Sequence, residues 1–236
     1  MRTLTMTPTI EFAHGGFVRL IDKMQTPLDL KTVNAARISM GKQVDAMSER
    51  DERLIKYLAS HEHTTPFRHS YMTFHIKAPI FVLRQWMKHQ IGCSWNEISG
   101  RYVEFNAEDM WKPSVDDWRE GAESVKQGSG GALDPALARV ASQTYAEAVE
   151  AAHEAYAALI AIGVCREQAR ACLPVALMSE CYWTTSVQAA THFLRLRLDA
   201  HAQVEIREYA QAVKTLILEN IAGAEPVLEA LHGDEP

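Results

Sequence analysis

The sequence is poor in the features that mark secreted or membrane-spanning proteins. Its four cysteines, Cys93, Cys165, Cys172 and Cys181, include no CxxC pair. Such sparse thiols argue against a disulfide-stapled secreted domain and suit a reducing compartment. No stretch reaches the roughly 18 apolar residues of a membrane span, and the first residues lack the apolar core of a signal peptide. We therefore expect a cytoplasmic protein.

Excess positive charge and the common nucleotide-binding motifs are also missing. Lys and Arg together number 24 against 30 Asp and Glu, a formal net charge of -6. This balance argues against broad binding to DNA or RNA phosphates, although a few arginines can still hold a small anion. The sequence contains no GxGxxG and no GxxxxGK[ST] motif, which disfavours a Rossmann or P-loop site.

What is present is an ordinary globular composition with one irregular segment. The 236 residues are 47% hydrophobic, enough to bury a core without a disulfide or metal. Residues 106–131 are acidic and end in Gly128-Ser129-Gly130-Gly131, which predicts a surface excursion that we expect to be mobile. The later helical pattern is too one-sided to stand alone, so we predict a single domain over residues 1–236.

Hydrophobic periodicity predicts an α+β fold with strands early and a helical C-terminal half. The first part alternates short elements, with strands expected at 17–21, 67–77 and 101–105, and helices at 28–39, from Ser48 to His61 and from Pro79 to Gly92. From Asp134-Pro135 onward an apolar stripe predicts one long helix, stopped by Gly163 and followed by helices near 166–181, 187–198 and 202–221.

The densest group of polar side chains lies between Arg84 and Tyr102. Arg84 and Lys88 are four residues apart on the predicted helix, and like charges at that spacing are favourable only beside an anion or a carboxylate. Gly92 begins a polar turn whose N–H groups are suited to an anion. The alternative is a solvated basic helix end, and the residues alone leave both interpretations open.

Arg170 and Arg197 each lie among apolar residues. A buried arginine needs a carboxylate, a phosphate or a polarised carbonyl to offset its desolvation. One interpretation is a structural ion pair, for Arg197 with Asp199 or Glu205. The other is two-point recognition of a pyrimidine edge or a phosphate by the planar guanidinium.

Other chemistries have weaker support. Four histidines lie between residues 61 and 75, but no HExxH or Cys/His ligand spacing accompanies them, and we expect no metal. Cys93 has no recognisable base for a nucleophilic role. Ser99 is not part of a GxSxG elbow. A zinc site or a covalent mechanism is therefore disfavoured.

The run Trp95-Asn96-Glu97-Ile98-Ser99-Gly100-Arg101-Tyr102 is the most distinctive in the sequence. Further distinctive runs lie at 36–39, 61–67, 77–82, 85–94, 170–174 and 196–203. Together, in this order, they resemble the signature of the flavin-dependent thymidylate synthases over most of the chain. Several motifs in sequence are more specific than any one of them.

This resemblance implies an activity, cofactors and an assembly. Members of the family make dTMP from dUMP, taking one carbon from methylenetetrahydrofolate and electrons from NADPH through FAD. They are homotetramers of an α+β fold whose active sites combine several subunits. We therefore expect a methyltransferase of nucleotide biosynthesis that binds dUMP, folate, NADPH and FAD, and neither nucleic acid nor membrane.

The resemblance also implies roles for particular residues. Arg197 is expected to be catalytic, lying against the uracil and favouring ionisation at N3. The residues expected to bind dUMP are Gln85, Trp86, Met87, Lys88, Glu97, Ile98, Ser99, Gly100, Arg101, Arg170 and Arg197. Those expected to contact FAD are His63, Thr65, Lys88, His89, Gln90, Glu97, Ser186, Val187, Gln188 and His192, with His63 also near folate.

The sequence departs from the family pattern where positive charge normally faces the flavin. The usual Arg-His-Arg is Lys88-His89-Gln90, Gln188 stands where arginine is common, and Ser186 and His192 stand where asparagine is common. The missing cations predict weaker FAD binding or a shifted reduction potential, which arginine at 90 and 188 should reverse. Two alternatives stay open: a flavin-dependent pyrimidine-nucleotide hydroxymethylase, and a dUMP-binding protein that has lost catalysis.

Overall fold

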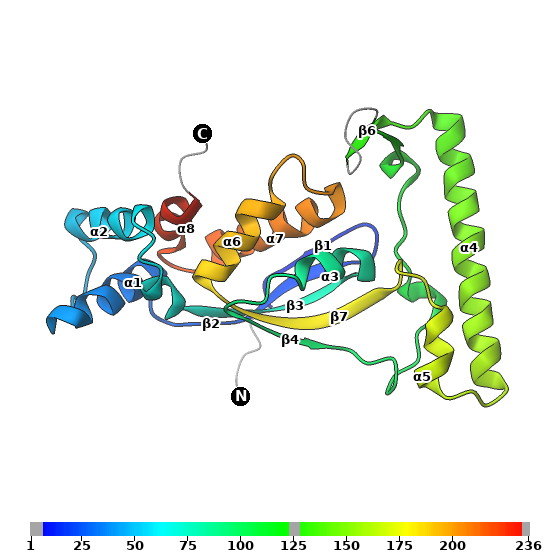
Figure 1. Cartoon of the computed structure of the whole chain (residues 1–236), viewed down its shortest axis with the longest axis horizontal. Helices are drawn as coiled ribbons and strands as arrows, with labels where there is room; N and C mark the ends of the chain where they lie inside the picture. Colours follow the sequence, from blue (N-terminus) through cyan, green and yellow to red (C-terminus); the bar gives the residue numbers. More distant parts are fainter. Residues whose placement is uncertain (1–6, 123–127, 233–236) are drawn as a thin grey trace.

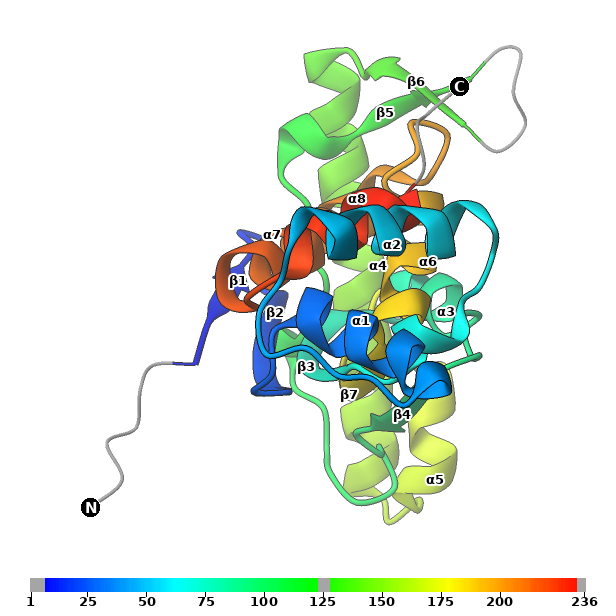
Figure 2. The ribbon, with the colours of Figure 1, turned by 90° about the vertical axis from the view of Figure 1, so that its left-hand side faces the viewer.

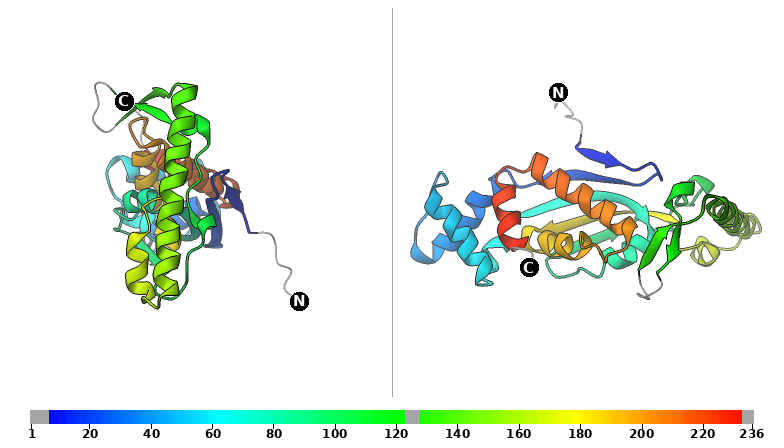
Figure 3. Two further views of the ribbon diagram at one scale, coloured as in Figure 1. Left: turned by 90° about the vertical axis from the view of Figure 1, so that its right-hand side faces the viewer. Right: turned by 90° about the horizontal axis from the view of Figure 1, so that it is seen from above.

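A five-stranded antiparallel sheet runs through the centre of the protein, in a computed structural model that describes residues 7–122 and 128–232 (Figure 1). The strand order is β1 (Thr9–Glu11), β2 (Phe17–Lys23), β3 (Tyr71–Pro79), β7 (Met178–Ser186) and β4 (Cys93–Glu97). One face of this sheet is covered by α3 (Ile80–Trp86), α6 (Val187–Arg197) and α7 (Val204–Asn220), as Figures 1 and 3 show.

The remaining helices gather at the two ends of the sheet. One end carries α1 (Leu28–Arg37), α2 (Glu49–Ser60) and α8 (Ala224–His232), which Figure 2 shows from that side. The other carries the long α4 (Pro135–Ala161), the short α5 (Arg166–Ala169) and a ribbon of β5 (Arg119–Gly121) and β6 (Ser129–Ala132). None of the helices in the described ranges has the length and apolar character needed to cross a membrane.

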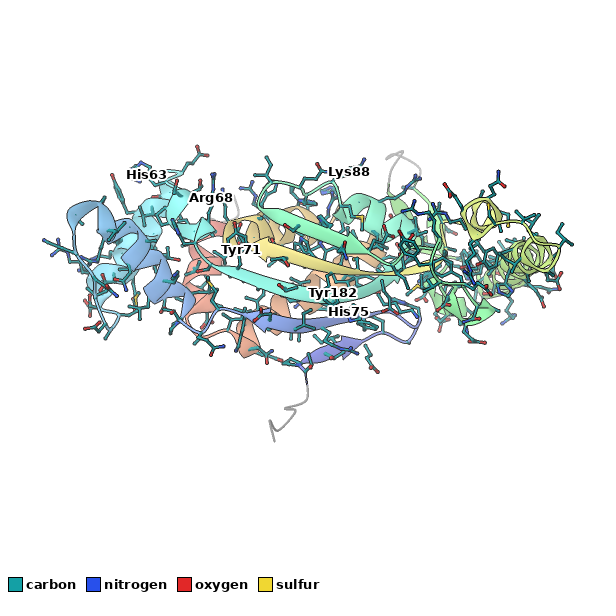
Figure 4. The ribbon with its side chains drawn as sticks, turned by 90° about the horizontal axis from the view of Figure 1, so that it is seen from below. His63, Arg68, Tyr71, His75, Lys88 and Tyr182 are labelled. Atoms are coloured by element: carbon teal, nitrogen blue, oxygen red, sulfur yellow. The ribbon has the colours of Figure 1, made fainter. Side chains whose placement is uncertain are left out.

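Strand β3 shows why one face of the sheet is covered and the other is polar. Met72, Phe74 and Ile76 alternate along it and are buried under the helices, as the two-residue period predicts. On the opposite face His75 lies beside Tyr182 of β7 by strand register (Figure 4). The predicted strand is therefore confirmed, although it begins at Tyr71 rather than at residue 67.

A group of aromatic rings fastens α3 and α6 to the sheet. Trp86 of α3 stacks on Phe193 of α6 with 4.6 Å between ring centroids, and it meets Trp183 of β7 edge-on at 5.2 Å. All three side chains are fully buried. Because each such ring removes roughly 150–250 Å² from water, the helix ends that carry Gln85 and Arg197 are positioned by core packing.

The capping box that the sequence predicts at the start of α2 also ties α2 to α1. Ser48 and Asp51 form the box, and the Asp51 carboxylate accepts from Arg37 Nε at 3.1 Å. Asp51 is only 2% exposed. Hydrogen bonds from Ser48, together with the Arg37 guanidinium, hold the pKa of Asp51 below its ordinary value although burial opposes them.

Replacing Asp51 with asparagine is expected to destabilise the fold by about 3 kcal/mol, because Arg37 loses the carboxylate that compensates its burial. The folded-state pKa of Asp51 is depressed, so this stabilisation is present above the ordinary pKa of 3.8 and disappears as the pH falls through the folded-state value. Urea unfolding at pH 7 and near pH 2 measures both effects. The exposed neighbour Glu52 provides the control: an equal loss in Glu52→Gln at pH 7 would contradict the assignment.

The described part of the acidic excursion is bound to the long helix. Asp134 is the N-cap of α4 and its side chain accepts backbone N–H groups of the first turn, as predicted. Farther along α4, the Tyr145 hydroxyl donates to Trp111 O at 2.6 Å. This contact ties the excursion to the helix face. Residues 123–127 of the predicted mobile segment lie outside the described residues.

The C-terminal half is less helical than the sequence predicts. The expected helix near 166–181 is limited to α5 and a 3₁₀ turn over Arg170–Cys172, after which the chain enters β7. This strand lies between β3 and β4 and is buried at most positions, so its residues lack the alternation of a half-exposed strand. The predicted α+β class is confirmed, but one long strand, β7, interrupts the helical C-terminal half.

The region around α3 also differs from prediction. Pro79 is the N-cap rather than the first helical residue, and the helix ends at Trp86. Lys88 therefore lies beyond the helix and does not share a helical face with Arg84. Gly92, with φ of +75°, belongs to the turn before β4 rather than to a helix end. Residues 101–105 are irregular, and the strand of this region is β4 instead.

Candidate active site

Arg197, at the C-terminal end of α6, is held against the residues that end α3. Its Nε donates to His89 Nε2 at 3.2 Å, and its Nη2 donates to Gln85 O at 3.4 Å. The side chain of Gln85 in turn bonds to Gln203, just before α7. Segments far apart in the sequence thus fix the position and plane of one half-buried guanidinium.

Of the two interpretations of Arg197, the structural ion pair with Asp199 or Glu205 is wrong. Asp199 instead bonds to His201 at 2.9 Å, and Glu205 pairs with Arg119 at 2.5 Å. Arg119 comes from the excursion, and no local pattern reveals that contact. Within the part of the chain that the structure describes, Arg197 has no carboxylate partner, so its charge remains for a ligand.

His89 beside Arg197 is neutral at physiological pH. Desolvation, followed by the charges of Arg197 and His192, lowers the pKa of His89 to about 4. The pKa of His192 is also lowered, first by desolvation and then by nearby arginines. Because His89 Nε2 accepts from Arg197, the imidazole proton is assigned to Nδ1. These two histidines therefore add no positive charge at neutral pH.

A second group of predicted residues surrounds the turn after β4. Glu97 accepts a hydrogen bond from Ser179 at 2.6 Å. Gly100 is buried, and a Cβ there would lie 2.7 Å from the Phe105 ring and 3.1 Å from Arg170 Cδ. A side chain at position 100 would collide with Phe105 and crowd Arg170, so glycine allows both residues to pack against the turn. Arg170 itself is exposed, which corrects the interpretation of a buried arginine in an apolar helix.

The same turn presents polar groups to solvent. Ser99 Oγ accepts the Arg101 N–H at 3.3 Å. The side chain of Arg101 is exposed, as is that of Ile98. A hydroxyl, a glycine backbone and two neighbouring arginines together form a surface suited to a phosphate group.

A third group lines a cavity of about 380 Å³ between the first turn of α6 and the turn before β4. Gly92 permits this approach, because an added Cβ would lie 2.8 Å from Ser186 Oγ. Ser186 is the N-cap of α6 and accepts the Ala189 N–H. The start of a helix carries partial positive charge, which favours an anion. The lining residues are Arg68, Tyr71, Ile91, Gly92, Ser186, Gln188, Ala189 and His192.

Arg68 and Tyr71 in this lining are absent from the sequence prediction. Arg68 ends a 3₁₀ turn over Thr65–Arg68. Its Nε donates to Gln188 Oε1 at 2.6 Å and its Nη2 donates to Thr64 Oγ1 at 3.0 Å. The nearness of Arg68 to the predicted cofactor residue Thr65 is the one local signal, since Gln188 is 120 residues away.

His63 lies at the same end of the sheet as Arg68 (Figure 4). Its ring meets Tyr57 edge-on at 6.1 Å, and His61 stacks on Tyr57 at 4.1 Å. Glu62 between the histidines has φ of 55°, a conformation that non-glycine residues rarely adopt. This turn therefore presents exposed aromatic faces that are suited to a planar ring.

The other predicted side chains differ in their access to a ligand. Trp86 and Val187 are fully buried, so only their main-chain atoms are available. Met87 is half-buried, whereas Lys88 and Gln90 are exposed in the turn after α3, where Figure 4 shows Lys88. Three groups are thus distinguished among the predicted residues of one chain: around Arg197, around Ser99 and around Gln188.

No competing chemistry is assembled in the described residues. Among them, no three His, Cys, Asp or Glu side chains form a group able to hold a metal ion. Cys93 Sγ lies 3.4 Å from Thr185 Oγ1, a hydroxyl that is not a general base. A nucleophilic mechanism through Cys93 has no support in this geometry.

Known proteins resemble this chain in sequence and in structure. The family described as thymidylate synthase complementing protein matches residues 19–221. Flavin-dependent thymidylate synthases of Kosmotoga olearia and Thermus thermophilus are 42% and 43% identical, over 86% and 90% of this chain and 86% and 75% of theirs. A UMP/dUMP methylase, PolB of Streptomyces cacaoi, solved with 5-Br dUMP, aligns with a TM-score of 0.79 and 31% identity over 94% of this chain and 96% of its own. The chain therefore belongs to the flavin-dependent thymidylate synthase family.

Proposed function

We propose that this protein catalyses the reductive methylation of dUMP to dTMP. Relatives of this chain are named flavin-dependent thymidylate synthases, and one structural neighbour, PolB, is named a UMP/dUMP methylase. The observation that carries the proposal is Arg197, a half-buried guanidinium with no carboxylate partner in the described ranges. FAD as the flavin, methylenetetrahydrofolate as the carbon donor and NADPH as the reductant complete the proposal.

Arg197 supplies a fixed positive charge for the uracil ring. Uracil C5 is a poor nucleophile until electron density moves toward it, and a fixed cation beside N3 stabilises the N3 anion and so enriches C5. Burial lowers the pKa of Arg197, but a guanidinium stays protonated at neutral pH. Its planar fork also matches adjacent ring atoms. His89 acts as a positioning residue, because its neutral Nε2 fixes the guanidinium plane.

The turn after β4 is the proposed site for the nucleotide phosphate. Ser99, Arg101 and Arg170 offer a hydroxyl and two charges in one place, and Gly100 keeps Arg170 close to the turn. Gln85 would bind the base, a role supported by its backbone carbonyl, which accepts a hydrogen bond from Arg197. Anchoring the phosphate would position C5 for the transfer.

The residues around the 380 Å³ cavity fit a flavin cofactor. Gly92 keeps the cavity walls close together, the start of α6 favours negative charge, and Arg68 provides a cation. Ser186, Gln188 and His192 would hold FAD from α6. When bound, FAD supplies electrons from NADPH that reduce the transferred carbon. Among the other residues proposed to contact the cofactor, Thr65 lies on the same 3₁₀ turn as Arg68.

We also propose a cytoplasmic homotetramer in which residues 1–236 act as one domain and subunits share active sites. The support is the separation of the groups: α6, which carries Arg197, lies over the middle of the sheet, whereas α5, which precedes Arg170, lies beside α4 at one end (Figures 1 and 2). A partner subunit would bring one group to the other.

The function is tested by titrating the purified protein with FAD and then assaying it with dUMP, methylenetetrahydrofolate and NADPH. We expect flavin absorbance that changes on binding and a product with the mass of dTMP. A product heavier by one oxygen would indicate the hydroxymethylase instead. Binding of dUMP without FAD binding or turnover would indicate the non-catalytic alternative. Parallel assays with UMP would test whether the ribose 2′-hydroxyl is excluded.

A further inference from the structure

We propose that Arg68 binds a phosphate of the flavin cofactor and replaces the cation that is missing at Gln188. This inference rests on the proposed function, because it assigns a role within the same cofactor site. The sequence alone predicted weaker FAD binding, because Gln188 lacks the positive charge of an arginine. If Arg68 supplies a positive charge at the same place, the loss at Gln188 is compensated. Arg68 is a residue that none of the resemblance motifs placed in the site.

The geometry brings Arg68 to the position of the missing charge. Its Nε donates to the Gln188 side chain at 2.6 Å, so the guanidinium lies directly against the residue that stands where arginine is common. Both side chains line the 380 Å³ cavity. The bond to Thr64 Oγ1 at 3.0 Å fixes the guanidinium from the other side. Arg68 is thus oriented before any ligand arrives, which lowers the entropic cost of binding.

The charge of Arg68 is uncompensated in the described part of the chain. No carboxylate there lies within ion-pair distance of it, whereas Arg37, Arg119 and Arg166 each pair with one. Among the eight residues that line the cavity, Arg68 is the only one with a permanent charge. The lowered pKa of His192 keeps that side chain neutral at physiological pH.

The cavity therefore combines a fixed cation with the start of a helix. Ser186 begins α6, an 11-residue helix, and this end carries partial positive charge. Two sources of positive potential aimed at one small space are the arrangement expected for a phosphate. The Gln188 amide, held by Arg68 through its oxygen, keeps its NH₂ donors for the same ligand.

The test measures FAD affinity directly, by quenching of flavin fluorescence in the full-length protein. Arg68→Gln is expected to weaken FAD binding about 10- to 100-fold, because a charge-assisted contact is lost. Adding Gln188→Arg to that variant is expected to recover most of the loss, since it places a cation on the same cavity wall. The matched control is Arg50→Gln, which removes an equal charge from an exposed position on α2 and should leave affinity unchanged.

The outcomes separate this inference from the proposed function. If the unmodified protein binds no FAD, the proposed function fails. If it binds FAD and Arg68→Gln binds equally well, the inference is overturned while the function stands. If Arg68→Gln weakens binding but neither Arg68→Lys nor the added Gln188→Arg recovers affinity, Arg68 supports the turn structurally and the inference is again overturned.

Discussion

Replacing Arg197 with alanine is expected to lower kcat for dTMP formation about 100- to 1,000-fold while the protein still folds and binds flavin. The size follows from the loss of a preorganised charge beside the atom where negative charge develops. The side chain is half-buried at a helix end and has no carboxylate partner in the described ranges. Its removal therefore leaves no charge unpaired there, and the fold should survive.

Arg197→Lys separates charge from shape. A lysine keeps the charge but loses the planar fork and the Nε bond to His89, so we expect it to lose most of the turnover as well. Single-turnover rates with saturating dUMP and FAD measure the effect, with Arg195→Ala, an exposed neighbour on α6, as the matched control. Near-normal turnover in Arg197→Ala with FAD bound would refute the N3 role.

Cys93→Ser serves as a second control for the mechanism. We expect it to keep its activity, because in the described ranges the Cys93 thiol bonds to the hydroxyl of Thr185 and to no general base. Abolished turnover in a folded, FAD-loaded Cys93→Ser protein would instead favour covalent catalysis.

The sequence predicted elements whose residues carry a local period or cap. Met72, Phe74 and Ile76 alternate because only one side of β3 faces the core, and Asp134 marks the start of α4 because its carboxylate satisfies free N–H groups. Strand β7 was not predicted from the sequence, because it is central and buried at most positions and so lacks a clear two-residue alternation. The alanine-rich stretch before it favours helix, and pairing with β3 and β4 overrides that preference.

In the candidate site, too, local patterns predict individual residues but not their distant partners. Arg197 attracts notice in the sequence because apolar residues flank it, but its partners could not be found there. His89 and Gln85 lie more than 100 positions away in the chain. The two candidates close in sequence have other partners: Asp199 pairs with His201, and Glu205 pairs with Arg119 from the excursion. Long-range contacts of this kind depend on the packing of α3 against α6, which no local pattern encodes.

Mixing two inactive variants is expected to restore activity. Arg101→Ala removes a charge of the proposed phosphate site, and Arg197→Ala removes the charge beside the base, so each alone should fall below about 1% of normal turnover. If one subunit supplies the Arg101 group and another supplies Arg197, random mixing in an oligomer leaves about a quarter of the sites with both groups intact. Co-expressed chains with two different affinity tags provide the mixed oligomers.

A matched pair makes the result specific to shared sites. Arg101 and Arg170 belong to the same group, since Gly100 brings Arg170 against the turn that carries Arg101. Mixing Arg101→Ala with Arg170→Ala should therefore restore nothing, because every site would draw this group from one defective subunit. Turnover could recover when Arg101→Ala is mixed with Arg197→Ala but not when it is mixed with Arg170→Ala. That result would follow only from a site divided between α6 of one subunit and the turn after β4 of another. No recovery in either mixture would place both groups of a site on the same chain and contradict the proposed shared assembly.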